Sequence, residues 1–249
     1  TLMKKLSILL AGAMVLAACG PKNEAPLTSY VNPLIGSGGH GHVFVGTSVP
    51  FGMVQLGPTS ITQTWDWCSG YQYSDTLVIG FSHTHLSGTG IGDLGDILLM
   101  PYDPAKTIYS SEYMPRKKTE AVHVYAHLDH AKEVVTPGYY SLEMPDYGVN
   151  VRLTATARTG LHEYTFTADT SAILVDLCSG IGWDGVTDWE LTVKDETHIE
   201  GYRRSSGWAE DHTYWFAAEF SEPVIGQTTE IITDKESATA LLFDTSVNK

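Results

Sequence analysis

The feature that most limits the fold of this chain is an alternation of apolar and polar residues that repeats from the middle of the sequence onward. Val149, Val151 and Leu153 alternate with polar side chains, and the same period occurs at residues 162–167 and 214–220. Because successive side chains of a strand point to opposite faces, this alternation predicts half-buried antiparallel strands. Gly, Pro, Asp and Ser separate the segments as turns. The sequence therefore predicts an all-β fold, an antiparallel β-sandwich of many strands.

Other segments depart from this alternation in an informative way. Ser171–Leu177 and Ala238–Phe243 are nearly uninterrupted apolar runs, which predict strands buried on both faces. Asp103–Tyr113 is the best candidate for a helix, and the pattern there is weak. Residues 30–100 are crowded with Gly, His, Trp and Ser, so we expect long loops on a rigid sheet. Loops of this kind commonly carry binding sites.

The charge balance excludes one large class of functions. The chain has 15 Lys and Arg against 29 Asp and Glu, a formal charge of −14, whereas a nucleic-acid surface requires clustered basic residues. Hydrophobic residues make up 43% and charged residues 18%, a composition that excludes a disordered chain. No stretch contains the ~20 apolar residues that a membrane-spanning helix needs.

The N-terminal residues predict export and a lipid anchor. A short basic region precedes the apolar segment from Leu6 to Ala18, and Leu16-Ala17-Ala18-Cys19 has the form of a bacterial lipobox. We therefore expect a signal peptide over residues 1–18, a lipidated Cys19 and a polar tether to residue 28. The alternative is an ordinary signal peptide that contains a cysteine. The lipobox predicts a lipoprotein in the periplasm, at the outer membrane or on the cell surface.

The two remaining cysteines leave the disulfide question open. Cys68 and Cys178 are the cysteines left after lipidation of Cys19. An exported protein meets an oxidising or mixed redox setting, in which the two thiols can pair. Two buried free thiols are equally consistent, because nothing in the sequence places these residues close together.

One aromatic segment has the composition of a sugar-binding surface. Trp65, Asp66 and Trp67 place two indole rings beside a carboxylate. Indole faces stack on the apolar C–H faces of sugar rings, and a carboxylate accepts hydrogen bonds from vicinal hydroxyls. The alternative is that these aromatics belong to the core, since Trp is on average highly buried.

Histidines in the same region suggest a polar pocket or a metal site. His40 lies in a glycine-rich turn, residues 36–42, whose glycines permit close approach of a ligand or tight packing against another domain. His83 and His85 would share one face of a strand, which is a spacing used by metal sites. A third metal ligand would then have to come from elsewhere in the loops, from His40, His42, Asp93 or Asp96. We expect hydrogen-bonding histidines and no bound metal in this chain.

Several longer segments together resemble glycoside hydrolase family 92, the calcium-dependent exo-α-mannosidases of the Bacteroidetes lipoprotein type. They occur in the family's order and spacing across residues 29–245. These segments are residues 30–36, 49–56, 65–75, 80–90, 93–101 and 201–208.

The resemblance implies a β-supersandwich over residues 29–249, the N-terminal domain of such an enzyme. In the family an (α/α)6-barrel domain follows it and carries the general acid, the general base and the main calcium ligands. We therefore assign no catalytic and no metal-ligating residue to this chain, and we expect it to be inactive by itself. The partners implied are mannose-containing glycans and the helical domain, with no nucleic acid and membrane attachment through the lipid anchor alone.

The implied activity is hydrolysis of terminal α-linked mannose from N-glycans or mannans with inversion, aided by Ca²⁺. This domain would lend loops to the substrate pocket, with substrate-binding residues Trp65, Asp66, Trp67, His40, His83 and His85. A non-catalytic glycan-binding surface lipoprotein is the main alternative. A metal hydrolase or cupin-like domain built on His83 and His85 is another.

Overall fold

The computed structural model describes residues 25–109, 123–231 and 237–247. The chain divides into two compact units, Thr1–Val31 and Asn32–Lys249. In the first unit the described residues contain one 3-10 helix, η1 (Leu27–Tyr30). The predicted signal peptide and the predicted lipidation site Cys19 lie outside the described residues. The described part of the chain contains no helix that is long and apolar enough to cross a bilayer.

The second unit confirms the all-β prediction, because its described residues form strands and short 3-10 turns without an α-helix. The strands of its first half are β1 (Thr47–Ser48), β2 (Gln55–Thr59), β3 (Leu77–Val78), β4 (Gly80–Ser82), β5 (Leu98–Tyr102), β6 (Ala126–His127), β7 (Glu133–Thr136) and β8 (Tyr139–Met144). Those of its second half are β9 (Val149–Ala155), β10 (Gly160–Phe166), β11 (Thr170–Asp176), β12 (Gly185–Val193), β13 (His198–Ser206), β14 (His212–Glu219), β15 (Val224–Ile231) and β16 (Ser237–Asp244). The 3-10 turns are η2 (Trp65–Trp67), η3 (Pro104–Lys106) and η4 (His130–Lys132).

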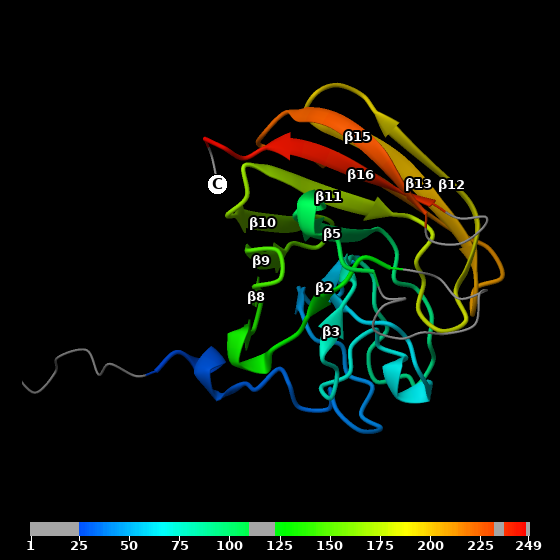
Figure 1. Cartoon of the computed structure of the whole chain (residues 1–249). Helices are drawn as coiled ribbons and strands as arrows, with labels where there is room; N and C mark the ends of the chain where they lie inside the picture. The colour runs from blue at the N-terminus through cyan, green and yellow to red at the C-terminus, as the bar shows by residue number, and fades with distance from the viewer. Residues whose placement is uncertain (1–24, 110–122, 232–236, 248–249) are drawn as a thin grey trace, which may run out of the picture. The chain divides into compact units, whose positions relative to one another are not determined.

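The described residues form four antiparallel sheets, of which three are the layers of this unit and the fourth is the short pair of β3 and β6 (Figure 1). The central sheet has the order β1-β2-β4-β5-β11-β16-β15, a four-stranded sheet has the order β10-β9-β8-β7, and a three-stranded sheet has the order β12-β13-β14. In the central sheet Ala172 of β11 lies opposite Tyr102 of β5 on one side and Leu242 of β16 on the other. Strands from both halves of the sequence therefore meet in one sheet.

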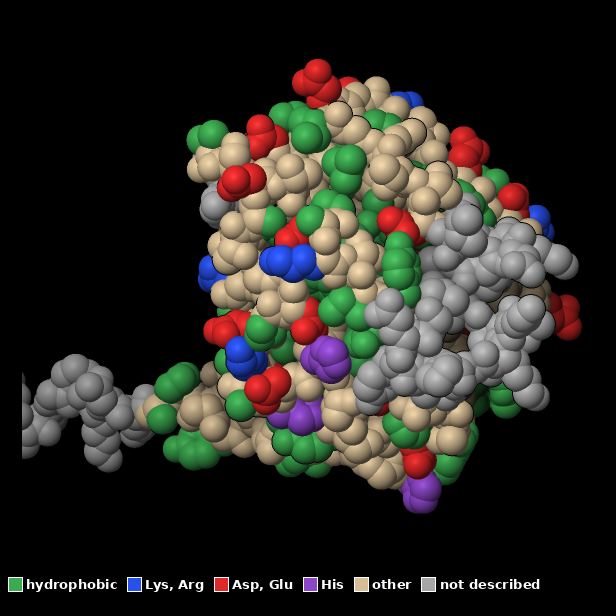
Figure 2. Space-filling view, viewed as in Figure 1, with side chains coloured by type: hydrophobic (Ala, Val, Ile, Leu, Met, Phe, Trp, Pro, Cys, Tyr) green, Lys and Arg blue, Asp and Glu red, His purple; other side chains and the backbone are tan. Residues whose placement is uncertain are grey.

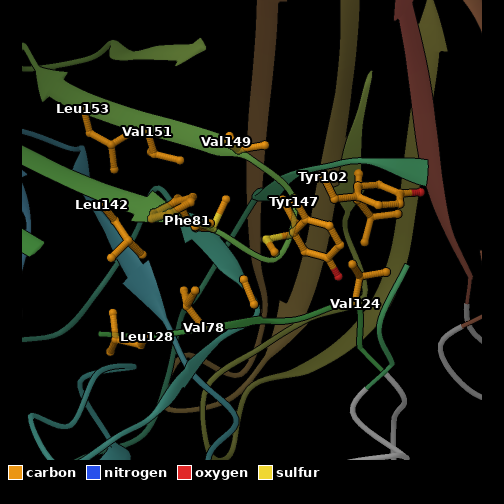
Figure 3. Packing of buried hydrophobic residues seen from close by; sticks show 14 of the residues in the cluster. Val78, Phe81, Tyr102, Val124, Leu128, Leu142, Tyr147, Val149, Val151 and Leu153 are labelled. Atoms are coloured by element: carbon orange, nitrogen blue, oxygen red, sulfur yellow. The ribbon is translucent and has the colours of Figure 1, made fainter. Parts of the chain in front are cut away.

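One face of the central sheet packs on the four-stranded sheet. Leu174 of β11 and Phe81 of β4 belong to the same buried cluster as the residues that alternate along β9. Figure 3 shows Val149, Val151 and Leu153 in a row on one side of that strand. The polar residues between them face solvent, which confirms the predicted half-buried strand.

The opposite face of the central sheet packs on the three-stranded sheet. Ile173 and Val175 of β11, which alternate with Leu174, form a second buried cluster with Ile199 of β13. Trp189 of β12 and Phe216 of β14 cover this cluster from the outer sheet. The apolar run in β11 is thereby explained, because a strand covered on both faces needs apolar residues at every position.

The prediction for residues 30–100 is right for most of the segment and incomplete for the rest. Long loops dominate it, but β2, β4 and β5 lie inside the central sheet. These strands are short, and Pro58 and Pro101 interrupt the residue types typical of strands, so pairing across the sheet determines their conformation. Of the candidate helix Asp103–Tyr113, the described part contains only the single turn η3, and residues 110–113 lie outside the described part.

A buried arginine joins the three-stranded sheet to the loops of the first half. Arg203 of β13 is completely buried and donates hydrogen bonds to Asp96 (2.7 Å), to the Ser179 carbonyl (2.8 Å) and to Asp184. Asp96 also accepts a hydrogen bond from the Thr84 hydroxyl at 2.6 Å. This network fixes the ends of the segment between residues 84 and 96, from which part of the candidate site is built.

Candidate functional site

The glycine-rich turn folds back on itself and presents two histidines. Gly36 and Gly39 have left-handed φ angles of 87° and 56°, and the Val43 amide donates a hydrogen bond to the Gly36 carbonyl. A Cβ atom at Gly41 would lie 2.1 Å from that carbonyl oxygen, so only glycine fits there. The tight turn carries both His40, whose side chain is exposed, and His42, whose side chain is buried.

The η2 turn separates the two tryptophans that the sequence places together. The Trp65 side chain donates through Nε1 to the Gly90 carbonyl at 2.7 Å, yet the residue is 59% exposed. Trp67 is half-buried and donates through Nε1 to Asp75 at 2.8 Å. Trp65 is therefore the residue of this pair that presents an open indole surface.

Three of the predicted residues come together around Asp66. His40 Nδ1 lies 2.5 Å from Asp66 Oδ1, and this hydrogen bond holds the pKa of the carboxyl below its usual value. His42 Nε2 lies 3.5 Å from the same oxygen. The Trp65 ring contacts both imidazoles, with centroid distances of 5.6 Å to His40 and 4.1 Å to His42. The site is thus an exposed indole beside an ionised carboxylate and two imidazoles.

His85 lies in the interior of the loop region. Its Nδ1 donates to the Gln55 carbonyl at 2.8 Å, and its Nε2 accepts hydrogen bonds from the Thr59 and Ser82 hydroxyls. Burial lowers the pKa of this imidazole to about 4, so it is neutral at pH 7. His85 is only 3% exposed, and this geometry argues against the predicted direct contact with a substrate.

His83 lies away from the Asp66 site and contacts a histidine of β10. Its Nδ1 donates to the Ile97 carbonyl at 2.7 Å, and its Nε2 lies 3.0 Å from Nε2 of His162 on β10. Burial lowers the pKa of both histidines. Because the ring nitrogens of His83 and His85 are bonded to separate partners, the structure does not support a metal held jointly by this pair.

His83 and His162 line an apolar groove of about 980 Å³ between β10 and β14. Tyr164 of β10 and Phe216 of β14 are among the residues that line it. On the face of the molecule seen in Figure 2, histidine side chains lie in the lower part, and the Lys and Arg side chains are scattered among acidic ones. The groove and the Asp66 site are separate candidate surfaces.

The residues that the structure describes do not suit calcium. Among them, one group of three His, Cys, Asp or Glu side chains is arranged to hold a metal ion, and it consists of His40, His42 and Asp66. Ca²⁺ takes six to eight oxygen ligands, whereas this group offers two nitrogens and one carboxylate. Calcium binding therefore stays a prediction.

From the sequence, His42 is expected only as a possible third ligand for the His83 and His85 pair, whereas in the structure it lies beside Asp66. The signal that could have found it is the spacing of His40 and His42, which is identical to that of His83 and His85.

Neither Cys68 nor Cys178 forms a disulfide in the described structure, and Cys68 is buried.

Solved structures with the same fold include glycoside hydrolases. The match to a family GH92 α-mannosidase from Bacteroides thetaiotaomicron in complex with mannoimidazole has a TM-score of 0.78 and 30% identity, and covers 88% of this chain and 31% of that one. A family GH92 inverting mannosidase from the same organism has the same fold, with a TM-score of 0.65 and 22% identity over 91% of this chain and 31% of that one.

A curated relative and a family model agree with the structural matches. A secreted glycosidase of Arthroderma benhamiae is 29% identical over 184 residues, which is 69% of this chain and 22% of the relative. The chain thus spans less than a third of the length of each of these proteins. The model of the glycosyl hydrolase family 92 N-terminal domain matches residues 30–245. The resemblance expected from the motifs is confirmed, and this chain belongs to glycosyl hydrolase family 92, of which it contains the N-terminal β-sandwich domain.

Proposed function

We propose that this chain is the N-terminal domain of an exo-acting α-mannosidase that removes terminal α-linked mannose from N-glycans or mannans with inversion. Its own contribution is a sugar-contacting surface formed by Trp65, Asp66 and His40. The observation that carries the proposal is the exposed Trp65 indole beside the ionised Asp66, on a loop fixed by the Gly90 hydrogen bond.

The chemistry of these side chains suits the rim of a sugar pocket. The indole face of Trp65 stacks on the C–H face of a pyranose ring. The Asp66 carboxylate, which accepts a hydrogen bond from His40, keeps a second oxygen for sugar hydroxyls. His40 is exposed and offers its remaining ring nitrogen to the same ligand. These groups bind and orient a sugar, and none of them is assigned the role of acid or base.

Inversion requires two carboxyl groups roughly 6.5–9.5 Å apart, one that protonates the leaving oxygen and one that activates water. We assign both, together with the calcium ligands, to the part of the enzyme that the relatives possess beyond the length matched here. Bound calcium would polarise mannose hydroxyls. The open aromatic surface on this domain supports a substrate pocket that the two parts form together.

Export completes the proposal. A secreted relative supports it, and the lipobox ending at Cys19 supports attachment of the exported protein to a membrane by lipid alone. Incorporation of labelled fatty acid that is lost in the Cys19→Ala variant would test this point. Incorporation that persists in the variant would contradict lipidation at Cys19.

The sugar-binding proposal is tested with the chain itself and an α-linked mannobiose, followed by NMR of the tryptophan indole N–H signals. We expect weak saturable binding that the Trp65→Ala substitution reduces by about tenfold, equivalent to ~1.4 kcal/mol. Trp215→Ala is the control, because Trp215 is 70% exposed on β14 and belongs to another surface. Equal binding by wild type and Trp65→Ala would contradict the proposed role.

Release of mannose from an aryl α-mannoside distinguishes the remaining alternatives. We expect none from this chain, since its acid and base are assigned elsewhere. Activity of the chain by itself would overturn that assignment. If a longer product of the same gene binds the sugar and releases no mannose, that result would favour the alternative of a non-catalytic glycan-binding protein.

A further inference from the structure

Asp66 and the two histidines beside it, His40 and His42, have the donor set of a transition-metal site. Their ligand atoms all lie within 4.8 Å of one another. Two imidazoles and one carboxylate form a common set of three protein ligands for Zn²⁺, and a fourth position remains for water or a ligand. We propose that His40, His42 and Asp66 bind a divalent ion of the zinc class. This inference concerns a site that shares His40 and Asp66 with the proposed sugar surface, and its test measures ion binding in the absence of carbohydrate, so either proposal can fail without the other.

The strongest support is a buried nitrogen that lacks a hydrogen bond. The His42 side chain is 5% exposed, and its Nε2 has no hydrogen-bond partner among the described residues. A buried polar atom without a partner destabilises the fold, because it has lost its hydrogen bonds to water. Asp66 Oδ1 lies 3.5 Å from this nitrogen, an ion-pair distance that is long for a hydrogen bond. A bound cation would give this nitrogen the partner that it lacks.

The His42 ring is held in this orientation by its surroundings. The backbone of His42 has a left-handed φ of 55°, which is uncommon for a residue with a side chain and recurs at functional sites. Its carbonyl accepts a hydrogen bond from the Gly88 amide at 2.7 Å, and the Trp65 ring lies against the imidazole. Trp65 is itself fixed to Gly90. The nitrogen is therefore positioned before any ion arrives.

The distances require only a small adjustment. Zinc bonds of roughly 2.0–2.2 Å place tetrahedral ligand atoms about 3.3 Å apart. The two measured separations from Asp66 Oδ1, 2.5 Å to His40 and 3.5 Å to His42, lie on either side of that value. His40 is the ligand that must move, and its side chain is 76% exposed, so that few neighbours other than Trp65 restrict it. The fourth position then opens toward solvent, where Asp66 is 25% exposed.

The experiment is isothermal titration of the full chain, free of affinity-tag histidines, with ZnCl₂, followed by visible absorption spectroscopy with Co²⁺. We expect one Zn²⁺ per chain with a micromolar dissociation constant and cobalt bands typical of tetrahedral coordination. His40→Ala and Asp66→Asn should each weaken zinc binding at least tenfold. Neither substitution removes a buried apolar contact, so both variants should fold.

The matched control is His127→Ala. His127 is also an exposed histidine paired with an aspartate, Asp146, at 3.0 Å, but this pair belongs to no group of three metal ligands in the described structure. Its loss should leave zinc binding unchanged. Absence of stoichiometric binding in the wild type, or equal binding in His40→Ala and Asp66→Asn, would overturn the proposal.

Discussion

Replacement of Arg203 by methionine is the most direct test of how the loop region is held on the sheets. Methionine preserves much of the apolar stem, and it removes the hydrogen bonds to Asp96, Asp184 and the Ser179 carbonyl. Both carboxyl side chains are buried, so they would lose their shared cation without gaining water. The substitution therefore isolates the electrostatic part of the interaction from the packing part.

The expected loss is large. Removal of one partner from a buried ion pair costs about 3–5 kcal/mol, because the remaining charge stays buried and uncompensated. For a domain of about 150–250 residues each kcal/mol lowers Tm by roughly 2–4 °C, so Tm should fall by about 6–20 °C. The adjacent Arg204 is a matched control on the same strand. It pairs with Asp211 at 2.6 Å in solvent, and Arg204→Met should cost at most ~1 kcal/mol.

The assay is urea denaturation at pH 7, monitored by tryptophan fluorescence, together with calorimetric Tm. Burial raises the pKa of Asp184 even beside Arg203, so this carboxyl gains a proton readily when the arginine is lost. The double variant Arg203→Met/Asp184→Asn should therefore recover part of the lost stability. A Tm for Arg203→Met equal to that of Arg204→Met would refute the reasoning, since the buried network would then contribute nothing.

Two further predictions concern pH and the glycine-rich turn. Acidification from pH 6.5 to 4 should destabilise the fold by about 3 kcal/mol through His85. In the unfolded chain this imidazole takes up a proton at its ordinary pKa of about 6.5, whereas in the folded protein its pKa is about 4, so proton binding favours the unfolded state over this range. His85→Gln should flatten this dependence in urea titrations, and an unchanged slope would contradict it. Gly41→Ala should abolish zinc binding because its Cβ would collide with the Gly36 carbonyl, whereas Gly38→Ala, whose nearest contact is 3.5 Å, should retain it. Equal affinities of these two variants in zinc titrations would show that the turn is not required.

The sequence predicts the sandwich well because its strands after residue 138 are defined by local patterns. The alternation in β9 and the apolar run in β11 each report directly which faces are covered. Short strands such as β2 and β4 carry no such pattern, since each has five residues or fewer and contains glycine or proline. Their conformation comes from neighbours in the sheet, which a linear pattern does not contain.

The candidate site is predicted in part for a similar reason. The residue types are correct around Trp65 and Asp66, because the chemistry of sugar binding is visible in composition. Which tryptophan is open, and which histidines meet the carboxylate, depends on a turn that brings together residues 26 positions apart. The burial of His85 depends on contacts with Gln55 and Thr59, which no spacing rule reveals.

The position of β11 between β5 and β16 has a consequence for the order in which the chain is made. Its partner β5 has been synthesised by the time β11 emerges from the ribosome, but β16 ends almost 70 residues later. At ~5–20 residues per second, one edge of this apolar strand lacks its partner for roughly 3–14 s. The strands β12 to β14 are synthesised in that interval and pack on the face of β11, not on its edge. The nascent chain therefore passes through a stage in which a hydrophobic strand edge is open to other chains, and chaperones that shield such edges should bind it before Asp244 has emerged.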